Sequence, residues 1–139
     1  MPHVLKLFLS PKKPFPMEEQ PEVRVVNDAG FEGCAHARRG GKRQVLLVDR
    51  ETLEAMNLTP GIIRENITTD GLNVNGLKLG QQLRIGETRM EVCAVCTPCD
   101  EMEKIRQGLR KELWGRRGMM CRVIEGGTIR CGDAIEKTS

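Results

Sequence analysis

The apolar residues of this chain are grouped into short runs, which turns containing glycine or proline separate. Runs of about four to eight residues with alternating or continuous apolar positions are typical of strands. They predict strands over residues 3–9, 22–26, 44–48, 79–85, 88–95, 119–124 and 128–130. Because these strands are short and do not alternate with helices, we expect a mainly β fold, a compact β-barrel with one or two helices.

Two of the turns have the form of hairpin connections. Residues 86–87 (Gly-Glu) separate the fourth and fifth predicted strands, and residues 126–127 (Gly-Gly) separate the sixth and seventh. A two-residue connection that contains glycine suits the tight turn of an antiparallel pair, because glycine tolerates positive φ angles. The pattern therefore predicts two hairpins in the second half of the chain.

A long helix is predicted in the segment between these hairpins. Four apolar residues recur there at steps of three, four and four, the spacing of one helix face: Met102, Ile105, Leu109 and Leu113. Thr97 is a suitable N-cap and Pro98 a suitable first helical residue, while Gly115 marks the end. A shorter helix over residues 50–57 is expected to be capped by Asp49. Both helices are expected to pack their apolar faces against the core.

Length and charge narrow the class of protein. The 139 residues suit a single domain over residues 1–139. The 22 Lys and Arg residues exceed the 19 Asp and Glu residues by three, which is too small an excess to indicate nucleic-acid binding. Three Phe, one Trp and no Tyr leave few rings for stacking on bases. We therefore expect no nucleic-acid partner and a local basic pocket rather than a basic face.

The sequence carries no targeting signal that we can identify. No apolar run approaches the roughly 20 residues of a membrane span. The apolar N-terminus is brief and lacks the basic lead and cleavage site of a secretory signal. We therefore expect a cytoplasmic protein with no membrane partner, whose six Cys residues are thiols or ligands rather than disulfides.

The most conspicuous cysteine motif is the run Cys93, Cys96 and Cys99. Three thiolates at this spacing could bind zinc or an iron–sulfur cluster, so a metal- or cluster-binding module is one alternative function. The predicted strand opposes it, because alternation points the side chains of Cys93 and Cys96 to opposite faces.

Cys99 differs from the other cysteines, because the predicted cap at Thr97 places it in the first turn of a helix. Unpaired backbone N–H groups and the helix dipole stabilise a thiolate there, while the acidic Asp100 and Glu101 oppose it. Cys99 is therefore the candidate reactive thiol. Four other cysteines are expected to be packing residues: Cys93, Cys96, Cys121 and Cys131.

Basic and polar residues near glycines form a second candidate site. A glycine-rich stretch over residues 30–43 carries Arg38, Arg39, Lys42 and Arg43. It also carries His36, which could act as an acid–base group or as a hydrogen-bond donor. Beside later turns lie Arg64, Asn66 and Arg117. An amide and two guanidinium groups would suit an anionic heterocycle with a phosphate arm.

Short motifs in a fixed order carry a family resemblance. They are Gly33-Cys34-Ala35-His36, Arg43-Gln44-Val45, Pro60-Gly61, Arg64-Glu65-Asn66-Ile67, Leu79-Gly80, Leu83-Arg84-Ile85-Gly86, Thr97-Pro98-Cys99, Arg117-Gly118, Arg122-Val123, Glu125-Gly126-Gly127 and Gly132-Asp133. The series resembles a MOSC domain, a family named for the C-terminal domain of molybdenum cofactor sulfurase. The match covers nearly the whole chain, so the chain is similar to a small stand-alone MOSC protein of bacterial type.

The resemblance implies a β-rich barrel that works with the molybdenum cofactor, a pterin dithiolene with a phosphate. It implies a cofactor-binding or sulfur-carrier domain with Cys99 as cofactor ligand or persulfide carrier. It also implies sulfur transfer or a reductase component as possible activities. By the resemblance, the positions of cofactor contacts are Arg64, Asn66 and Thr97. Three further candidates for cofactor binding match the family pattern: His36, Arg43 and Arg117.

The sequence departs from the family pattern at Cys34, where the family usually has Asp, and this adds a thiol that could cooperate with Cys99. The sequence also lacks the pyridoxal-phosphate-dependent desulfurase domain of larger relatives, so we expect neither pyridoxal phosphate binding nor sulfur generation. A sulfur donor or a molybdoenzyme or reductase is the expected partner. A non-catalytic partner of such an enzyme is the remaining alternative function.

Overall fold

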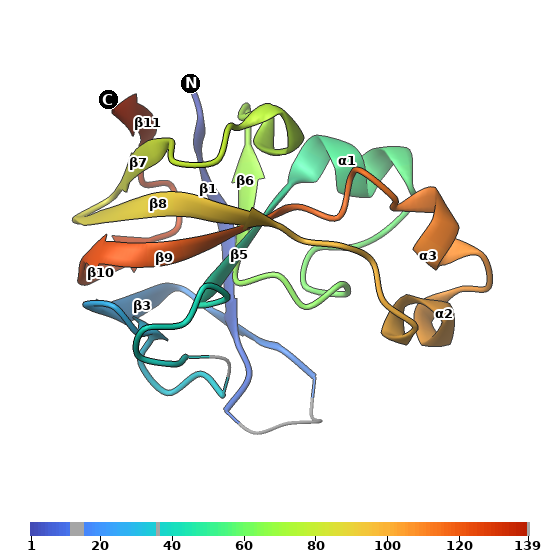
Figure 1. Cartoon of the computed structure of the whole chain (residues 1–139), viewed down its shortest axis with the longest axis horizontal. Coiled ribbons are helices and arrows are strands. Elements are labelled where there is room, and N and C mark those ends of the chain that lie inside the picture. The colour runs from blue at the N-terminus through green and yellow to red at the C-terminus, as the bar shows by residue number, and fades with distance from the viewer. Residues whose placement is uncertain (12–15, 36, 139) are drawn as a thin grey trace.

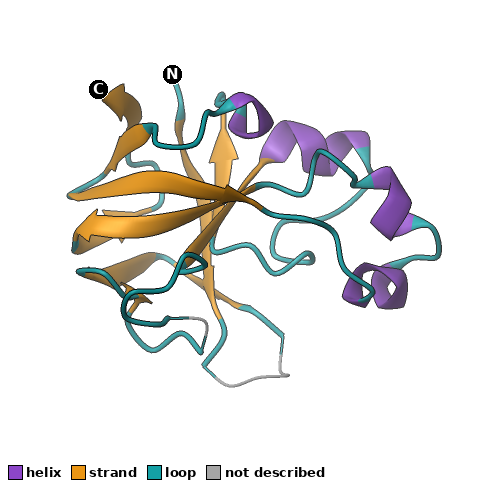
Figure 2. Cartoon of the chain, viewed as in Figure 1, coloured by secondary structure: helices purple, strands orange, loops and turns teal. Residues whose placement is uncertain are grey.

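The computed structural model describes residues 1–11, 16–35 and 37–138, and Figures 1 and 2 show them as a mainly β fold with a few short helices. Its strands are β1 (His3–Leu9), β2 (Glu18–Gln20), β3 (Glu22–Val26), β4 (Gly30–Phe31), β5 (Val45–Asp49), β6 (Ile67–Asp70), β7 (Gln82–Ile85), β8 (Thr88–Val95), β9 (Met119–Glu125), β10 (Gly127–Arg130) and β11 (Ile135–Thr138). Its helices are α1 (Arg50–Ala55), α2 (Glu101–Ile105) and α3 (Leu109–Glu112), with a single 3₁₀ turn at Val74–Gly76.

The described strands form two open sheets. The larger has the order β11-β7-β8-β9-β5-β6-β1-β2, and the smaller has the order β10-β3-β4. The β5–β6 pair is parallel and the other pairs are antiparallel. The mainly β class is therefore confirmed, whereas the expected closed barrel is not found. Near the ends of the chain His3 and Ala134 make one isolated bridge, which does not extend into a ladder that would close the large sheet.

Local signals predicted several elements well. The predicted bounds of β1, β3 and β8 agree with the structure, and the Asp49 carboxylate accepts the Thr52 N–H at 3.2 Å as the N-cap of α1. The first hairpin is confirmed, since β7 and β8 are antiparallel neighbours. The second is wrong. Strand β10 pairs with β3 in the small sheet, while β9 pairs with β5 and β8 in the large one.

The predicted long helix is broken into α2 and α3. Helix α2 ends before Arg106, whose backbone is extended (φ −161°, ψ 135°), and α3 begins after Gly108, which has a left-handed φ of +84°. The Glu103 carboxylate accepts the N–H groups of Gly108 and Arg110 at 2.9 Å each. The helix also begins later than predicted, with Asp100 rather than Thr97 as its N-cap. None of the helices in the described part of the chain is long and apolar enough to cross a membrane.

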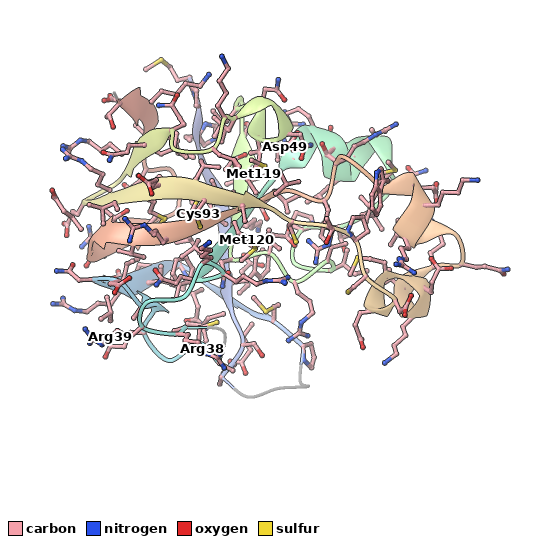
Figure 3. The ribbon with its side chains drawn as sticks, viewed as in Figure 1. Arg38, Arg39, Asp49, Cys93, Met119 and Met120 are labelled. Carbon is pink, nitrogen blue, oxygen red and sulfur yellow. The ribbon has the colours of Figure 1, made fainter. Side chains whose placement is uncertain are left out.

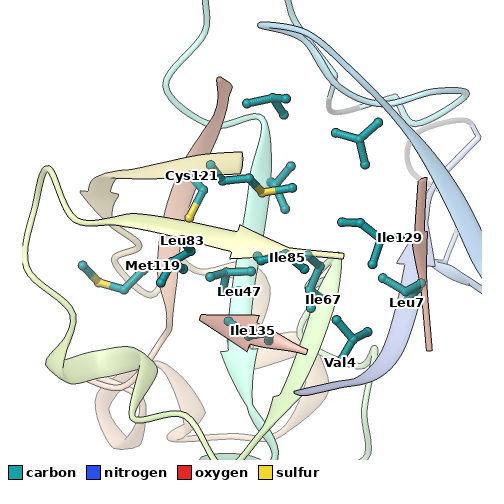
Figure 4. Packing of buried hydrophobic residues seen from close by; sticks show 14 of the residues in the cluster. Val4, Leu7, Leu47, Ile67, Leu83, Ile85, Met119, Cys121, Ile129 and Ile135 are labelled. Carbon is teal, nitrogen blue, oxygen red and sulfur yellow. The ribbon is translucent and has the colours of Figure 1, made fainter. Parts of the chain in front are cut away.

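The core is aliphatic and has two parts. The first lies between the sheets, and Figure 4 shows side chains from both of them, such as Leu47 of β5 and Ile129 of β10. The second lies where the helices meet the large sheet and contains the apolar face that the sequence assigned to one helix, with Met102, Leu109 and Leu113 fully buried. The helices gather at one end of the molecule, where β5 leads into α1 and α3 leads back to β9 (Figure 1).

Candidate functional site

A cavity of about 650 Å³ lies beside the large sheet, within the range of small-molecule sites. Its lining contains five cationic residues: Arg38, Lys42, Arg43, Arg64 and Arg117. No Asp or Glu belongs to the lining among the described residues. A cavity with cations on several sides and no carboxylate favours an anionic ligand.

The loop that carries the first of these cations is held by Gln44, which is almost completely buried. Its side-chain carbonyl accepts the Val123 N–H at 2.8 Å, and its amide donates to the Asp28 carboxylate at 3.2 Å and to the Arg38 carbonyl at 3.1 Å. One side chain thus ties the loop to β9 and fixes the backbone at Arg38. Figure 3 shows Arg38 and its neighbour Arg39 on this loop, and only Arg38 lines the cavity.

The far end of the loop is held by a cysteine of β8. The Cys93 thiol donates to the Lys42 carbonyl at 2.9 Å, and burial raises the pKa of this thiol. This hydrogen bond makes Cys93, which is labelled in Figure 3, a structural anchor for Lys42 rather than a reactive thiol.

Asn66 lies at the base of the cavity with its amide engaged by the protein. Its Oδ1 accepts the Leu46 N–H at 2.9 Å, and its Nδ2 donates to the Phe8 carbonyl at 3.3 Å and to Cys34 Sγ at 3.7 Å. Asn66 therefore joins β1 to β5 in addition to lining the cavity. Cys34, which is buried, lies against this amide behind the lining.

Arg117 is the unusual residue of the site. Its side chain is only 6% exposed, yet its Nε and Nη1 atoms have no hydrogen-bond partner among the described residues. Buried donors are normally satisfied, and a buried charged donor without a partner costs several kcal/mol. Because Arg117 lines the cavity, an anion bound there can accept these hydrogen bonds.

Behind Arg117 lies a fully buried carboxylate. Glu65 Oε2 accepts the Gly61 N–H and the Thr68 hydroxyl, each at 2.8 Å, while Oε1 has no partner among the described residues. Burial raises the pKa of Glu65 above its ordinary value of 4.5, and the Gly61 hydrogen bond and the charge of Arg117 partly oppose this shift. Glu65 and Arg117 interact electrostatically, but no ion pair joins them in the described part of the chain.

The raised pKa of Glu65 predicts how stability depends on pH. The unfolded chain releases this proton near pH 4.5 while the folded chain keeps it, so stability contributed by Glu65 is lost as pH rises from 4.5 through the folded-state pKa. In Glu65→Gln this loss is absent. The measured quantity is the unfolding free energy of the variant minus that of the wild type, from urea unfolding. We expect this difference to be constant below pH 4.5 and to increase as pH rises from 4.5 through the folded-state pKa of Glu65. A difference that does not vary with pH would contradict the assignment.

The structure brings together some of the residues predicted from the sequence and separates others. Arg43, Arg64, Asn66 and Arg117 line the cavity. Thr97 and Cys99 do not; both are exposed, in the non-helical segment that precedes α2. The placement of Cys99 in the first turn of a helix is therefore wrong. His36 lies outside the described residues.

Cys96 was expected to be a packing residue, and it does belong to the core beside the helices. Sequence reasoning missed that it also borders the cavity. Its side chain is 5% exposed and lines the cavity together with the apolar Leu46 and Met120. The alternation along β8 placed Cys96 on the buried face, but nothing in that pattern shows that this face borders a cavity. Arg38 and Lys42 could be anticipated from the basic loop, although not distinguished there from Arg39.

The metal-binding alternative receives no support from the geometry. Within the described residues, no three His, Cys, Asp or Glu side chains are close enough to share a metal ion. All three cysteines of the motif, Cys93, Cys96 and Cys99, are described residues. Despite their close spacing in the sequence, they do not form a cluster of metal ligands in the fold.

Comparisons with known proteins agree with this architecture. The family model described as "MOSC domain" matches residues 35–136. Curated proteins give no match to the sequence. Among solved structures, the YuaD protein from Bacillus subtilis superposes with a TM-score of 0.83 at 19% identity, covering 97% of this chain and 94% of its own. YiiM from Geobacillus stearothermophilus gives 0.83 at 18% identity, covering 100% of this chain and 76% of its own. At these identities the likeness is one of fold.

Proposed function

Because this chain belongs to the MOSC domain family, we propose that it binds the molybdenum cofactor in the cationic cavity and that Cys99 carries sulfur as a persulfide. The whole chain, residues 1–139, would then act as one domain. A sulfur donor or a molybdoenzyme is the partner that this function requires. The exposure of Cys99 supports the carrier role, because a thiol that lies outside the cavity can be reached by a donor protein.

The observation that supports the proposal most strongly is that Nε and Nη1 of the Arg117 guanidinium have no hydrogen-bond partner among the described residues. A buried Arg with two orphaned donors is costly in the free protein, and a bound anion removes this cost. A phosphate oxygen is a suitable acceptor because guanidinium groups bind phosphate through paired hydrogen bonds.

The other residues of the cavity fit the same ligand. Arg38, Lys42, Arg43 and Arg64 supply positive charge for the phosphate and for the dithiolene, and the apolar Leu46 and Met120 can pack on the pterin. The bound cofactor would supply molybdenum redox chemistry. The residues of this chain would neutralise its charge and hold its orientation.

The proposal is tested by purifying the protein from a host that makes the cofactor. We expect pterin, detected by fluorescence after oxidation, to co-purify with the wild type and with Arg39→Met, whose substituted side chain lies outside the cavity lining. Absence of pterin from both proteins would overturn the binding proposal.

The role of Cys99 is tested on the same preparations by intact mass. We expect an adduct of about 32 Da, one persulfide sulfur, on the wild type, and its removal by reductant. In Cys99→Ser the adduct should be lost while pterin is retained. Equal adduct in the two proteins would remove Cys99 from the sulfur-carrier role.

A further inference from the structure

The cavity contains a thiol that the proposed function does not use. Cys96 is the one cysteine in the lining among the described residues, and the Cys96 N–H donates to the Gly118 carbonyl at 3.0 Å. The pairing of β8 with β9, which ends at Val95 and Met119, is therefore followed by one more backbone hydrogen bond. This bond fixes the backbone of Cys96 beside the residue that follows Arg117.

A second, independent observation indicates that a ligand occupies this part of the cavity. Arg117 is more than nine-tenths buried, lines the same cavity, and has two guanidinium nitrogens without partners in the described part of the chain. The backbone bond between Cys96 and Gly118 links the two cavity-lining segments directly. A ligand that satisfies Arg117 therefore lies in the cavity that Cys96 borders.

Cys96 also differs from the cysteines whose role is structural. Cys121 is completely buried among aliphatic side chains between the sheets, where burial strongly raises its pKa. Cys93 is engaged with the Lys42 carbonyl. Cys96 packs with the apolar Leu46 and Met120 on one side, as an ordinary core cysteine does, but all three also border the cationic cavity.

We propose that Cys96 is a ligand-contacting residue, which makes the cavity select anions that carry a thiophilic centre, such as an electrophilic sulfur or a soft metal. The cationic side chains bind the anionic groups of the ligand, and the Cys96 sulfur contacts the thiophilic atom of the ligand. This inference deepens the proposed function and rests on it only for the identity of the ligand. The class of ligand follows from the thiol and the cations themselves.

The inference is tested with two alkylating reagents of nearly equal shape, iodoacetate and iodoacetamide. In both reactions the thiolate sulfur forms a bond to carbon and iodide leaves. We expect the ratio of the iodoacetate rate to the iodoacetamide rate to be about tenfold higher at Cys96 than at the exposed Cys99, because the cavity attracts the anion. The rates are measured separately in Cys99→Ser and Cys96→Ser, by peptide mass spectrometry.

Two further measurements connect the thiol to the cations. Inorganic pyrophosphate should slow the alkylation of Cys96 and leave that of Cys99 unchanged. Arg117→Met should lower the charge preference at Cys96, and Arg38→Met provides a second variant if the first does not fold. A Cys96 that does not react in the folded protein, or that shows the same rate ratio as Cys99, would overturn the inference.

The test separates this inference from the proposed function. Charge-selective, pyrophosphate-protected alkylation of Cys96 in a protein that never carries pterin would support the thiol–anion site and exclude the molybdenum cofactor as its ligand. Pterin binding without selectivity at Cys96 would support the proposed function and reject Cys96 as a contact residue.

Discussion

Arg117→Met is expected to bind molybdopterin about 100- to 1,000-fold more weakly than the wild type, in anaerobic titrations. Each hydrogen bond to a charged group contributes about 1.5–3 kcal/mol. Two guanidinium nitrogens of Arg117, Nε and Nη1, have no acceptor within the part of the chain that the structure describes. Two such bonds amount to about 3–6 kcal/mol. Each 1.4 kcal/mol is a factor of ten, so the lower part of this range, about 3–4 kcal/mol, gives the expected weakening. Methionine fills a similar volume without the charge.

The same substitution should leave the stability of the free protein nearly unchanged. Arg117 forms no ion pair with the described residues, and its Nε and Nη1 have no hydrogen-bond partner there, so its removal deletes two unsatisfied donors and only an electrostatic interaction with Glu65. Replacement of a buried charge by an apolar side chain of similar volume is often neutral or stabilising. The matched control is Arg39→Met, which removes an exposed charge from the basic loop and should retain wild-type affinity. Equal affinities of Arg117→Met and the wild type would contradict the assignment of Arg117.

Gly118→Ala is expected to destabilise the protein by about 3 kcal/mol or more in urea unfolding. Gly118 has φ +109°, a backbone conformation that alanine adopts only with strain, and an added Cβ would lie 2.3 Å from the Leu47 carbonyl oxygen and 2.9 Å from Val48 Cγ2. The nearest of these atoms belongs to the backbone of the central strand β5, which cannot move without disturbing its pairs with β6 and β9.

Gly132→Ala separates the cost of the left-handed backbone from the cost of the close contact with β5. Gly132 has a similar φ, +93°, but an added Cβ there would meet nothing within 4 Å. We expect this control to show only the cost of the left-handed conformation, about 1–2 kcal/mol. If the two variants are equally destabilised, the close approach of Gly118 to β5 does not contribute to stability.

Strands were predictable because their signals are local. The apolar pattern and flanking turns of β1, β3 and β8 lie within the segments themselves. Sheet closure and pairing are not local properties. The turn at residues 126–127 has the composition of a hairpin, but its two strands enter different sheets. Strand β10 pairs with β3, which lies about 100 residues earlier in the chain, and no local pattern reports that pairing.

The helical segment between β8 and β9 shows a different limit of prediction from sequence. Its apolar spacing correctly identified the buried face, since Met102, Leu109 and Leu113 are all in the core. The prediction of one continuous helix was wrong because the extended backbone at Arg106 and the left-handed Gly108 divide the segment into two short helices that bury the same apolar face. Apolar periodicity reports which side is buried, and it is insensitive to such a break.

The candidate site was predicted in its cations but not in its thiol. Arg43, Arg64 and Arg117, which the resemblance named as candidates, line the same cavity, and their role there stays a prediction. The choice of Cys99 over Cys96 depended on a helix start that the structure moves to Glu101. The local alternation along β8 shows that Cys96 is on the buried face, but not that this face borders a cavity. The cavity forms where the backbone bond between Cys96 and Gly118 joins residues 22 positions apart, and that bond has no signature in the local sequence.

The way in which the cavity is assembled also bears on folding kinetics. Its lining comes from four separated segments, within residues 35–46, 64–66, 96 and 117–120, which the pairs β5–β6, β5–β9 and β8–β9 bring together. Pairings between distant segments form slowly, on a scale of about milliseconds to seconds. No partly folded chain that lacks them can present the anion site. Ligand capture by a refolding chain would therefore report completion of the sheet, and the ligand would stabilise only the fully assembled state.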